Sequence, residues 1–253
     1  MAYSYRIFVP DGNTTALVMG IEPDAAERRR IQDEIMRRYG DVEQVGFISG
    51  DSGCPRLEMA GGEFCGNAVR AAAWHYLGGR PGEILIRSSG TGRALRAGVL
   101  EDLRVWTQMP VYESAEKVRV IEDGLYWAEM EGISHLVVSP RRAVPEPARM
   151  LESAKNLLLR YDLYGGAACG VIFTERVSGA LKIHPCVFVI PAGTAYYETA
   201  CGSGSVAVAL AAAALRGSSK KLPLLQPSGK IIEATVEYAD KKILEARICG
   251  RVR

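Results

Sequence analysis

One short pattern occurs twice in the chain: a cysteine, a glycine and a small polar residue directly ahead of an alanine-rich apolar run. The first copy spans residues 65–74 and the second spans residues 201–215. Asn or Ser beside Gly, followed by good helix formers, is typical of the first turn of a helix. A helix that is apolar all round is predicted to be enclosed on every side. The pattern therefore predicts two buried helices, each beginning at a cysteine.

The surroundings of the two copies also match. Cys201 lies 136 positions after Cys65, and Gly229 lies 139 positions after Gly90. Near-equal offsets at two landmarks indicate an internal repeat of half a molecule. Three strand-like runs follow each predicted helix, at residues 83–87, 93–99 and 103–107 after the first and at residues 222–226, 231–238 and 243–248 after the second.

The repeat predicts an α/β (α+β) fold of two pseudo-symmetric halves, each a β-sheet or barrel wrapped around a central helix. Proline and polar residues interrupt the strands at residues 109–117, which indicates a boundary there. We expect an N-terminal half at residues 1–113 that carries Cys65, and a C-terminal half at residues 114–253 that carries Cys201. Whether the C-terminal residues complete the N-terminal half is left open.

The first segment of the chain predicts strands at residues 5–10, 15–19 and 44–49. Between the last two, a Pro-Asp start and a glycine stop at Gly40 indicate a helix over residues 24–39. Arginines in this helix are interleaved with Asp and Glu, which favours a solvated face over a basic binding patch.

Composition excludes several classes of function. The formal net charge of +2 across 253 residues gives no reason to expect nucleic acid or a membrane surface as partner. The longest apolar run, residues 206–215, is too short to cross a bilayer. The N-terminal residues lack the layout of a signal peptide, so a cytoplasmic location is expected. Six cysteines without a Cys-x-x-Cys pair or a nearby His predict free thiols and no metal site.

Cys65 and Cys201 are the predicted catalytic residues. A cysteine at a helix N-terminus lies near free N–H groups and the positive end of the helix dipole, which favour the thiolate. Two such N-termini at one cleft would hold a carboxylate. One sulfur can then remove the α-proton of an amino acid while the other delivers a proton to the opposite face. This two-base mechanism inverts a carbon without a cofactor.

Other readings fit less well. A cysteine nucleophile in acyl transfer needs a histidine base, and His75, one of three histidines, falls inside the first predicted helix. The glycines and serines after Cys201 lack the lysine of a phosphate-binding loop. From another class of function, a non-catalytic amino-acid-binding protein on the same fold remains an alternative.

The chain resembles the diaminopimelate-epimerase superfamily of two-cysteine, cofactor-independent amino acid racemases. The Cys-Gly-Asn motif at Cys65 and the Cys-Gly-Ser-Gly motif at Cys201 carry this resemblance. It implies the two-half fold, a small amino acid as substrate, and either a monomer or a homodimer. Through the resemblance and the helix N-termini, the expected substrate-binding residues are Asn13, Gln44, Gly66, Asn67, His135, Glu198, Gly202 and Ser203.

Differences from the diaminopimelate epimerases indicate a substrate with a different side chain. Between Ile190 and Cys201 the chain has no arginine to anchor a second carboxylate. Residues 58–63 and 196–199 are similar to the histidine racemases of opine-metallophore biosynthesis, so histidine is the expected substrate. Another amino acid, or diaminopimelate itself, is the alternative. We expect Met59, Cys169, Ser134 and residues 195–197 to form the wall around the substrate side chain.

Overall fold

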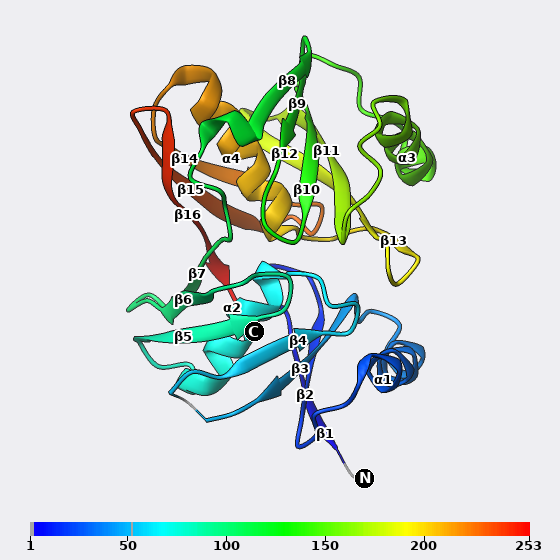
Figure 1. Ribbon diagram of the computed structural model, residues 1–253, viewed down its shortest axis with the longest axis vertical. Helices are drawn as coiled ribbons and strands as arrows, with labels where there is room; N and C mark the ends of the chain where they lie inside the picture. The colour runs from blue at the N-terminus through cyan, green and yellow to red at the C-terminus, as the bar shows by residue number, and fades with distance from the viewer. Residues whose placement is uncertain (1–2, 52) are drawn as a thin grey trace.

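The computed structural model describes residues 3–51 and 53–253. This part of the chain forms a mixed α/β fold with one large sheet and four α-helices (Figure 1). The helices are α1 (Ala25–Arg38), α2 (Gly66–Leu77), α3 (Met150–Arg160) and α4 (Gly202–Arg216). Two short 3-10 helices, η1 (Ala115–Lys117) and η2 (Pro147–Arg149), lie in the connections.

The first seven strands precede residue 110, and the other nine follow it. The first group is β1 (Ser4–Phe8), β2 (Thr15–Met19), β3 (Gln44–Ser49), β4 (Arg56–Met59), β5 (Gly82–Ser88), β6 (Ala94–Val99) and β7 (Arg104–Gln108). The second group is β8 (Val118–Glu122), β9 (Leu125–Ala128), β10 (Ser134–Val138), β11 (Ala168–Val177), β12 (Ala180–Val189), β13 (Thr194–Tyr197), β14 (Lys220–Leu225), β15 (Ile231–Ala239) and β16 (Lys242–Arg251).

The same succession of strand pairings occurs in both groups. From β1 to β7 the neighbours pair antiparallel, parallel, antiparallel, parallel, antiparallel and antiparallel. From β9 to β16, with β13 left aside as an extra strand beside β12, the order of pairings is identical. Each parallel pair needs a crossover connection, and α1 and α2 provide these crossovers in the first group as α3 and α4 do in the second.

Figure 1 shows two bodies stacked along the long axis, with α2 inside one and α4 inside the other. α2 packs against β2, β5, β6 and β7, and α4 packs against β9, β10, β14, β15 and β16. Nearly all residues in the first two turns of both helices are buried. Such helices must be slender, which accounts for their alanine content. α2 and α4 also contact each other, so the two helices meet where the bodies join.

Strand β16 ties the two bodies together. It pairs with β15 along most of its length and with β7 over residues 247–251. Beyond it, the carbonyl of Arg253 accepts a hydrogen bond of 2.8 Å from the N–H of Val9. The last residues of the chain therefore belong to the sheet around α2.

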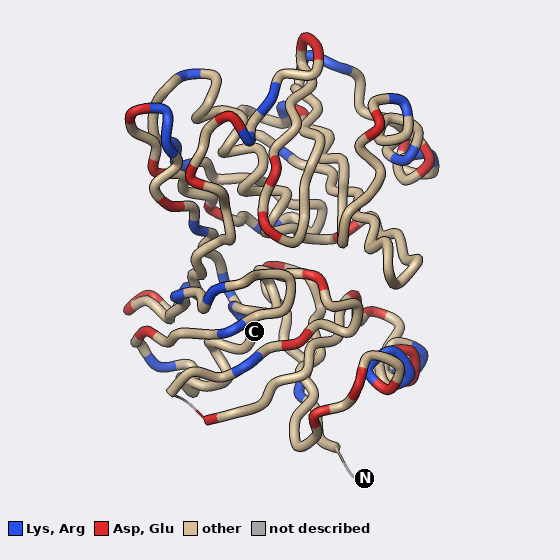
Figure 2. The backbone as a smooth tube through the Cα atoms, viewed as in Figure 1, with Lys and Arg blue, Asp and Glu red and all other residues tan. Residues whose placement is uncertain are grey.

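The remaining helices cover the outside. α1 and α3 lie on the flanks of the two bodies, each over its own apolar cluster. Arginines and acidic residues alternate along α1 (Figure 2), and Arg30 pairs with Glu27 and Glu34. The expected solvated face of this helix is confirmed. No helix in the described residues is long and apolar enough to cross a membrane.

Candidate active site

Both central helices begin at a cysteine, as the sequence predicts. The Sγ atom of Cys65 accepts a hydrogen bond of 3.4 Å from the N–H of Ala68 and caps α2. The Sγ atom of Cys201 accepts one of 3.2 Å from the N–H of Gly204 and caps α4. Both cysteines are buried and have nearly the same extended backbone conformation. The two sulfur atoms therefore occupy equivalent positions at the two helix starts.

The two cysteines line one cavity between the bodies. Six further residues expected at the site lie in its wall, namely Gln44, Gly66, Asn67, Glu198, Gly202 and Ser203. Four of these six belong to the first turns of α2 and α4, whose backbone N–H groups have no partner within the helix. The cavity thus combines two thiols with two helix N-termini.

Asn13 lies behind the cavity wall and does not line it. Its amide donates a 3.0 Å hydrogen bond to the Glu43 carboxylate and accepts one of 3.0 Å from the hydroxyl of Thr15. Glu43, which the sequence analysis did not single out, does line the cavity and also accepts a 3.2 Å hydrogen bond from the N–H of Thr199. Asn13 therefore orients a carboxylate of the wall.

His135 likewise lies behind the wall, on the side of Cys201. Its Nε2 is 2.8 Å from the hydroxyl oxygen of Ser203, which is in turn 3.5 Å from the Cys201 sulfur. Burial lowers the pKa of His135 to about 3, so its ring is neutral. The histidine can fix the orientation of the Ser203 hydroxyl but cannot supply a positive charge.

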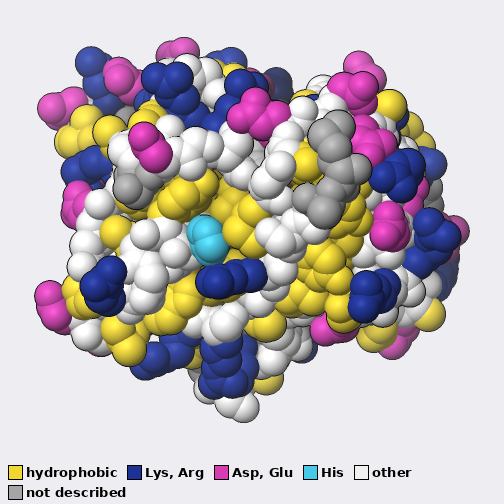
Figure 3. All heavy atoms as spheres, turned by 90° about the horizontal axis from the view of Figure 1, so that it is seen from below, with side chains coloured by type: hydrophobic (Ala, Val, Ile, Leu, Met, Phe, Trp, Pro, Cys, Tyr) yellow, Lys and Arg dark blue, Asp and Glu magenta, His cyan; other side chains and the backbone are white. Residues whose placement is uncertain are grey.

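The remaining two histidines lie outside the cavity wall. His75 lies in the last turn of α2, the end opposite to Cys65, and its ring stands edge-on to Phe8. Figure 3, which shows the molecule from below, has one histidine on this face, beside apolar side chains and a basic one. His184 is held between Tyr197 and Glu175 at 2.7 and 2.8 Å. Neither one lines the cavity.

Gln44 connects one thiol to a buried carboxylate. The thiol of Cys65 donates to the Gln44 side-chain oxygen, and the amide nitrogen of Gln44 donates to Glu198 at 3.1 Å. Burial raises the pKa of Glu198 to about 8. Glu198 also acts on Cys201 electrostatically, so this one carboxyl group influences both sulfur atoms.

The protonation of the two cysteines differs from the expectation. The pKa of Cys65 is raised to about 12, chiefly by burial and to a lesser degree by the nearby carboxyl groups of Glu198 and Glu63. Burial followed by the charge of Glu198 raises the pKa of Cys201 well above its ordinary value. The helix N–H groups act in the opposite direction, but loss of solvation outweighs them. Both cysteines are therefore thiols at neutral pH, and the prediction that the helix N-termini favour the thiolate is wrong.

The wall of the outer cavity also differs from the expectation. Met59 and Cys169 are packed into apolar clusters, and neither Ser134, Ala195 nor Tyr197 lines the cavity. On β13, Tyr196 faces the cavity, while Tyr197 points away toward His184, because successive side chains of a strand alternate in direction. We call the outer wall those lining residues that are neither Glu43 nor among the catalytic and substrate-binding residues expected from the sequence, namely Gln32, Val45, Gly61, Glu63, Phe64, Ile133, Val187, Val189, Ala192, Thr194 and Tyr196.

The cavity carries a concentration of acidic groups. Glu43, Glu63 and Glu198 all line it, and the described residues of the wall include no Lys, Arg or His. Burial raises the pKa of each of these carboxyl groups. Such a cavity favours a ligand with cationic or N–H donor groups, provided that its own carboxylate lies at the helix N-termini.

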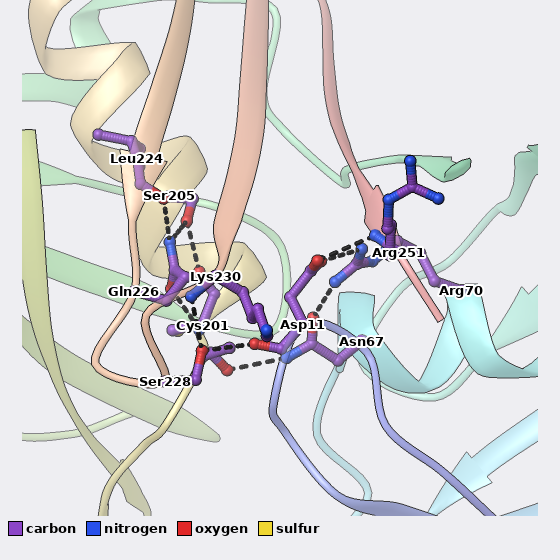
Figure 4. Close-up of polar contacts among 11 residues, drawn as sticks. Asp11, Asn67, Arg70, Cys201, Ser205, Leu224, Gln226, Ser228, Lys230 and Arg251 are labelled. Carbon is purple, nitrogen blue, oxygen red and sulfur yellow. Dashed lines mark hydrogen bonds and ion pairs between the residues drawn. The ribbon is translucent and has the colours of Figure 1, made fainter. Parts of the chain in front are cut away.

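A buried polar network fixes the two helix starts relative to each other (Figure 4). The Asn67 side chain donates a hydrogen bond of 2.9 Å to the carbonyl of Ala200 and accepts one of 2.8 Å from Arg70. Arg70 forms a buried ion pair of 2.6 Å with Asp11. Asn67 thus uses its side chain to join α2 to the segment before Cys201, which leaves only its backbone facing a ligand.

A second arm of the network supports α4. The Gln226 side chain accepts a hydrogen bond of 2.9 Å from the N–H of Cys201 and donates one of 3.1 Å to the hydroxyl of Ser205. Sequence reasoning missed Gln226, Glu43 and Gln32. Glu43 precedes the recognised Gln44 at the start of a strand, and that adjacency was the available signal. Nothing in the local sequence distinguishes Gln226 or Gln32 from surface glutamines.

Comparisons with known proteins agree with this geometry. The family described as "Histidine racemase CntK N-terminal domain" matches residues 4–253. A histidine racemase of Fusobacterium nucleatum subsp. nucleatum (ATCC 25586) is 30% identical over 249 residues, covering 91% of this chain and 89% of that protein. A histidine racemase of Staphylococcus aureus (strain Mu50) is 23% identical over 239 residues, covering 88% and 85%.

Solved structures share the fold. A hydroxyproline epimerase from Agrobacterium vitis, with bound trans-4-hydroxy-L-proline, superposes with a TM-score of 0.65 at 15% identity, covering 100% of this chain and 90% of that one. A PhzF-family phenazine biosynthesis protein from Enterococcus faecalis gives 0.62 at 16% identity, covering 100% and 96%.

The class of protein is thereby defined as a racemase or epimerase, an isomerase. Within that class, the chain belongs to the histidine racemase family.

Proposed function

We propose that this chain racemises free histidine by a two-base mechanism in which Cys65 and Cys201 act on opposite faces of Cα. The observation that supports this most directly is that both cysteines cap helices at one cavity. A thiol on each side of a bound carbon acid is sufficient to remove one proton and deliver another. No cofactor is required by this scheme.

The amino acid head fits the inner cavity. Its carboxylate would accept hydrogen bonds from the backbone N–H groups of Gly66, Asn67, Gly202 and Ser203, at the positive ends of two helices. These donors also stabilise the negative charge that moves onto the carboxylate when Cα loses its proton. The α-ammonium group would lie against Glu198, with Glu43 nearby.

The proton inventory requires one thiolate. We infer that Cys201 releases its proton to solvent when the substrate ammonium group binds, because that positive charge offsets the negative charge of the thiolate, while Glu198 keeps its own proton. The thiolate then takes the α-proton, and the thiol of Cys65 gives its own proton to the opposite face of Cα. Cys65 is left as the thiolate, which is the starting state for the reverse direction.

The charges of the outer cavity favour histidine over diaminopimelate. A second carboxylate would face Glu63 without any cationic partner in the described wall, and burying an unpaired charge is costly. Tyr196 and several aliphatic side chains suit a flat ring of moderate polarity. The names of the two relatives compared above point the same way.

We also propose that the fold arose by duplication of a half-molecule, with a boundary between residues 113 and 114. The matching succession of strand pairings and the matching cysteine caps support this proposal. In this view each half contributes one helix N-terminus and one acid–base group, and residues of β16 return to complete the first half.

The decisive experiment incubates the purified chain with L-histidine, and separately with D-histidine, in heavy water without added cofactor. We expect both to reach the same mixture, with deuterium at Cα of the inverted product because thiol protons exchange with solvent. L-Alanine and diaminopimelate serve as comparison substrates. Retention of the original α-hydrogen would contradict the two-thiol mechanism. Tight binding of histidine without any inversion would favour the non-catalytic binding protein.

A further inference from the structure

One carboxylate oxygen at the cavity has no partner. Oε2 of Glu63 is closed off from solvent and makes no hydrogen bond, although the residue lines the cavity. A buried acceptor without a donor is uncommon in folded proteins because it is costly to leave unsatisfied. The free oxygen therefore indicates a donor that arrives with the ligand.

The local backbone holds this carboxylate in place. Burial raises the pKa of this carboxyl group, and the backbone N–H groups of Gly61 and of Glu63 itself lie close enough to oppose that shift. Gly61 also makes the position possible, since a Cβ at that residue would lie 2.5 Å from Oε2 of Glu63 and 3.1 Å from a methyl group of Val189. The glycine thus provides the space into which the carboxylate folds, beside Val189.

Glu63 differs from the other two acidic groups of the cavity. Glu198 is hydrogen-bonded to Gln44, and Glu43 is hydrogen-bonded to Asn13 and Thr199. Both therefore belong to networks around the inner cavity, where the amino acid head is proposed to lie. Glu63 makes no hydrogen bond to another side chain of the described residues, although it too lines the cavity.

We propose that Glu63 is the specificity-determining residue and accepts a hydrogen bond from an imidazole N–H of the substrate. This inference rests on the proposed histidine racemase function. A side chain that lacks an N–H donor leaves Oε2 unpaired, and a site built to pair a polar group discriminates strongly against ligands that lack it. An anionic side chain is disfavoured further by repulsion.

Methylated histidines test which ring nitrogen is recognised. The wild-type protein should racemise one of Nδ1-methyl- and Nε2-methyl-L-histidine much better than the other, because only one methyl group replaces the N–H that Glu63 accepts. We expect the ratio of kcat/KM between the two isomers to exceed roughly 10-fold. Glu63→Gln should reduce this ratio toward one and lower kcat/KM for histidine by roughly 10- to 100-fold. Its matched control is Glu101→Gln, an exposed glutamate with no hydrogen bond to lose.

A second variant moves the carboxylate without removing it. In Gly61→Ala the new methyl group must displace Oε2, the free end of a flexible side chain. The same loss of discrimination between the methylated histidines is expected, and this variant keeps the test valid if Glu63→Gln folds poorly. Gly92→Ala is its control, since a Cβ there meets nothing within 4 Å.

The outcomes separate the two proposals. If the wild-type protein racemises histidine but Glu63→Gln and Gly61→Ala keep the wild-type ratio, the inference about Glu63 is overturned and the proposed function stands. An equal loss for histidine, alanine and both methylated histidines would also overturn it, because Glu63 would then serve the amino acid head. If the wild-type protein does not invert histidine at all, the proposed function fails and this inference fails with it.

Discussion

At the scale of single residues, the two cysteines have equivalent backbone positions but different partners. The thiol of Cys65 donates to Gln44, whereas Cys201 has Ser203 and the neutral ring of His135 behind it. Glu198 is the group common to both, through Gln44 on one side and through its charge on the other. The asymmetry means that a change at Glu198 acts on Cys201 through its charge and on Cys65 also through Gln44.

Replacing either cysteine by serine should abolish racemisation in both directions. A hydroxyl is too weak an acid or base to substitute for the thiol, so kcat/KM should fall by about 10²- to 10⁴-fold. Polarimetry starting from each enantiomer measures the loss, and unchanged unfolding curves show that the fold is retained. Full activity in Cys65→Ser or in Cys201→Ser would rule out the two-thiol mechanism.

Alkylation should report the protonated state of the thiols. Because the pKa of Cys65 is raised to about 12 and that of Cys201 is well above its ordinary value, iodoacetamide at pH 7.5 should label them at least about 10-fold more slowly than the partly exposed Cys54. Mass spectrometry of digested peptides gives the rates.

The variant Glu198→Gln tests the cause of these raised pKa values. Without the ionised carboxylate, the pKa of both thiols should fall, so labelling at pH 9 should be faster than in the wild-type protein. Glu101→Gln should leave the rates unchanged. Fast labelling of the unmodified protein at neutral pH would show that burial does not hold the thiols protonated.

The residues that belong to a sequence motif could be predicted. The residues whose role depends on which way a side chain points could not. Cys65 and Cys201 follow from a repeated pattern that is local in sequence. Whether Tyr196 or Tyr197 faces the cavity depends on the register of β13 against β12, and a one-residue change reverses every side chain. The raised pKa of the thiols was likewise unpredictable, because it depends on how deeply they are buried.

At the scale of elements, the two helix starts meet over one side chain of β16. A Cβ at Gly66 would lie 3.0 Å from Cδ1 of Ile248, and one at Gly202 would lie 2.5 Å from the same atom. The glycine after each cysteine therefore allows both helices to approach this strand closely. The two glycines recognised in the motif have this packing role in addition to their backbone N–H groups.

Gly202→Ala should disturb the site without unfolding the protein. The added methyl group must push Ile248 aside or displace the start of α4, at an expected cost of about 1–3 kcal/mol of stability. A shift of about 1 Å at the cysteine should lower kcat/KM by about 10²-fold. The double variant with Ile248→Val, which removes Cδ1, should recover much of the loss. Equal activity of Gly202→Ala and the wild-type protein would contradict this account of the packing.

Secondary structure was predictable where local signals are strong. The helix expected over residues 24–39 is observed at Ala25–Arg38, with Asp24 as its cap, and the strand expected at residues 44–49 is observed without change. Both central helices end at a glycine in the left-handed conformation, Gly78 and Gly217. By contrast, α3 and the strands around it lie in a segment for which the sequence analysis offered no element, because no repeated landmark marks it.

At the scale of the whole molecule, the two bodies are not independent. The sheet runs continuously from β1 through β7 and β16 to β8, so one strand belongs to both bodies. Buried hydrogen bonds also connect the two bodies, as the bond from the Asn67 side chain to the carbonyl of Ala200 shows. The sequence could indicate two similar halves, but the sharing of β16 requires long-range pairing that no local pattern encodes. Stability should therefore be a property of the whole chain.

The pH dependence of that stability should have a broad maximum between about pH 4.5 and 6.5. The pKa of Glu198 is raised from 4.5 to about 8, so between these values the folded protein holds a proton that the unfolded chain has lost. Stability then falls as the pH rises toward 8. The pKa of His135 is lowered from 6.5 to about 3, so the unfolded chain takes up a proton that the folded protein refuses. The stability contributed by His135 is therefore lost as the pH falls from 6.5 toward 3. The effects of His135 and Glu198 oppose each other between pH 4.5 and 6.5.

Urea unfolding measured from pH 4 to 8.5 tests this balance. Between pH 6.5 and 8 only the Glu198 effect of the two remains, and one proton gives a slope of at most about 1.4 kcal/mol per pH unit. Glu198→Gln cannot release a proton, so its free energy of unfolding should change less over that interval, while Glu101→Gln should follow the wild-type curve. Parallel curves for Glu198→Gln and the wild-type protein would mean that Glu198 does not hold its proton in the folded state. An ionised Glu198 would then oppose thiolate formation at Cys201 more strongly than the proposed mechanism assumes.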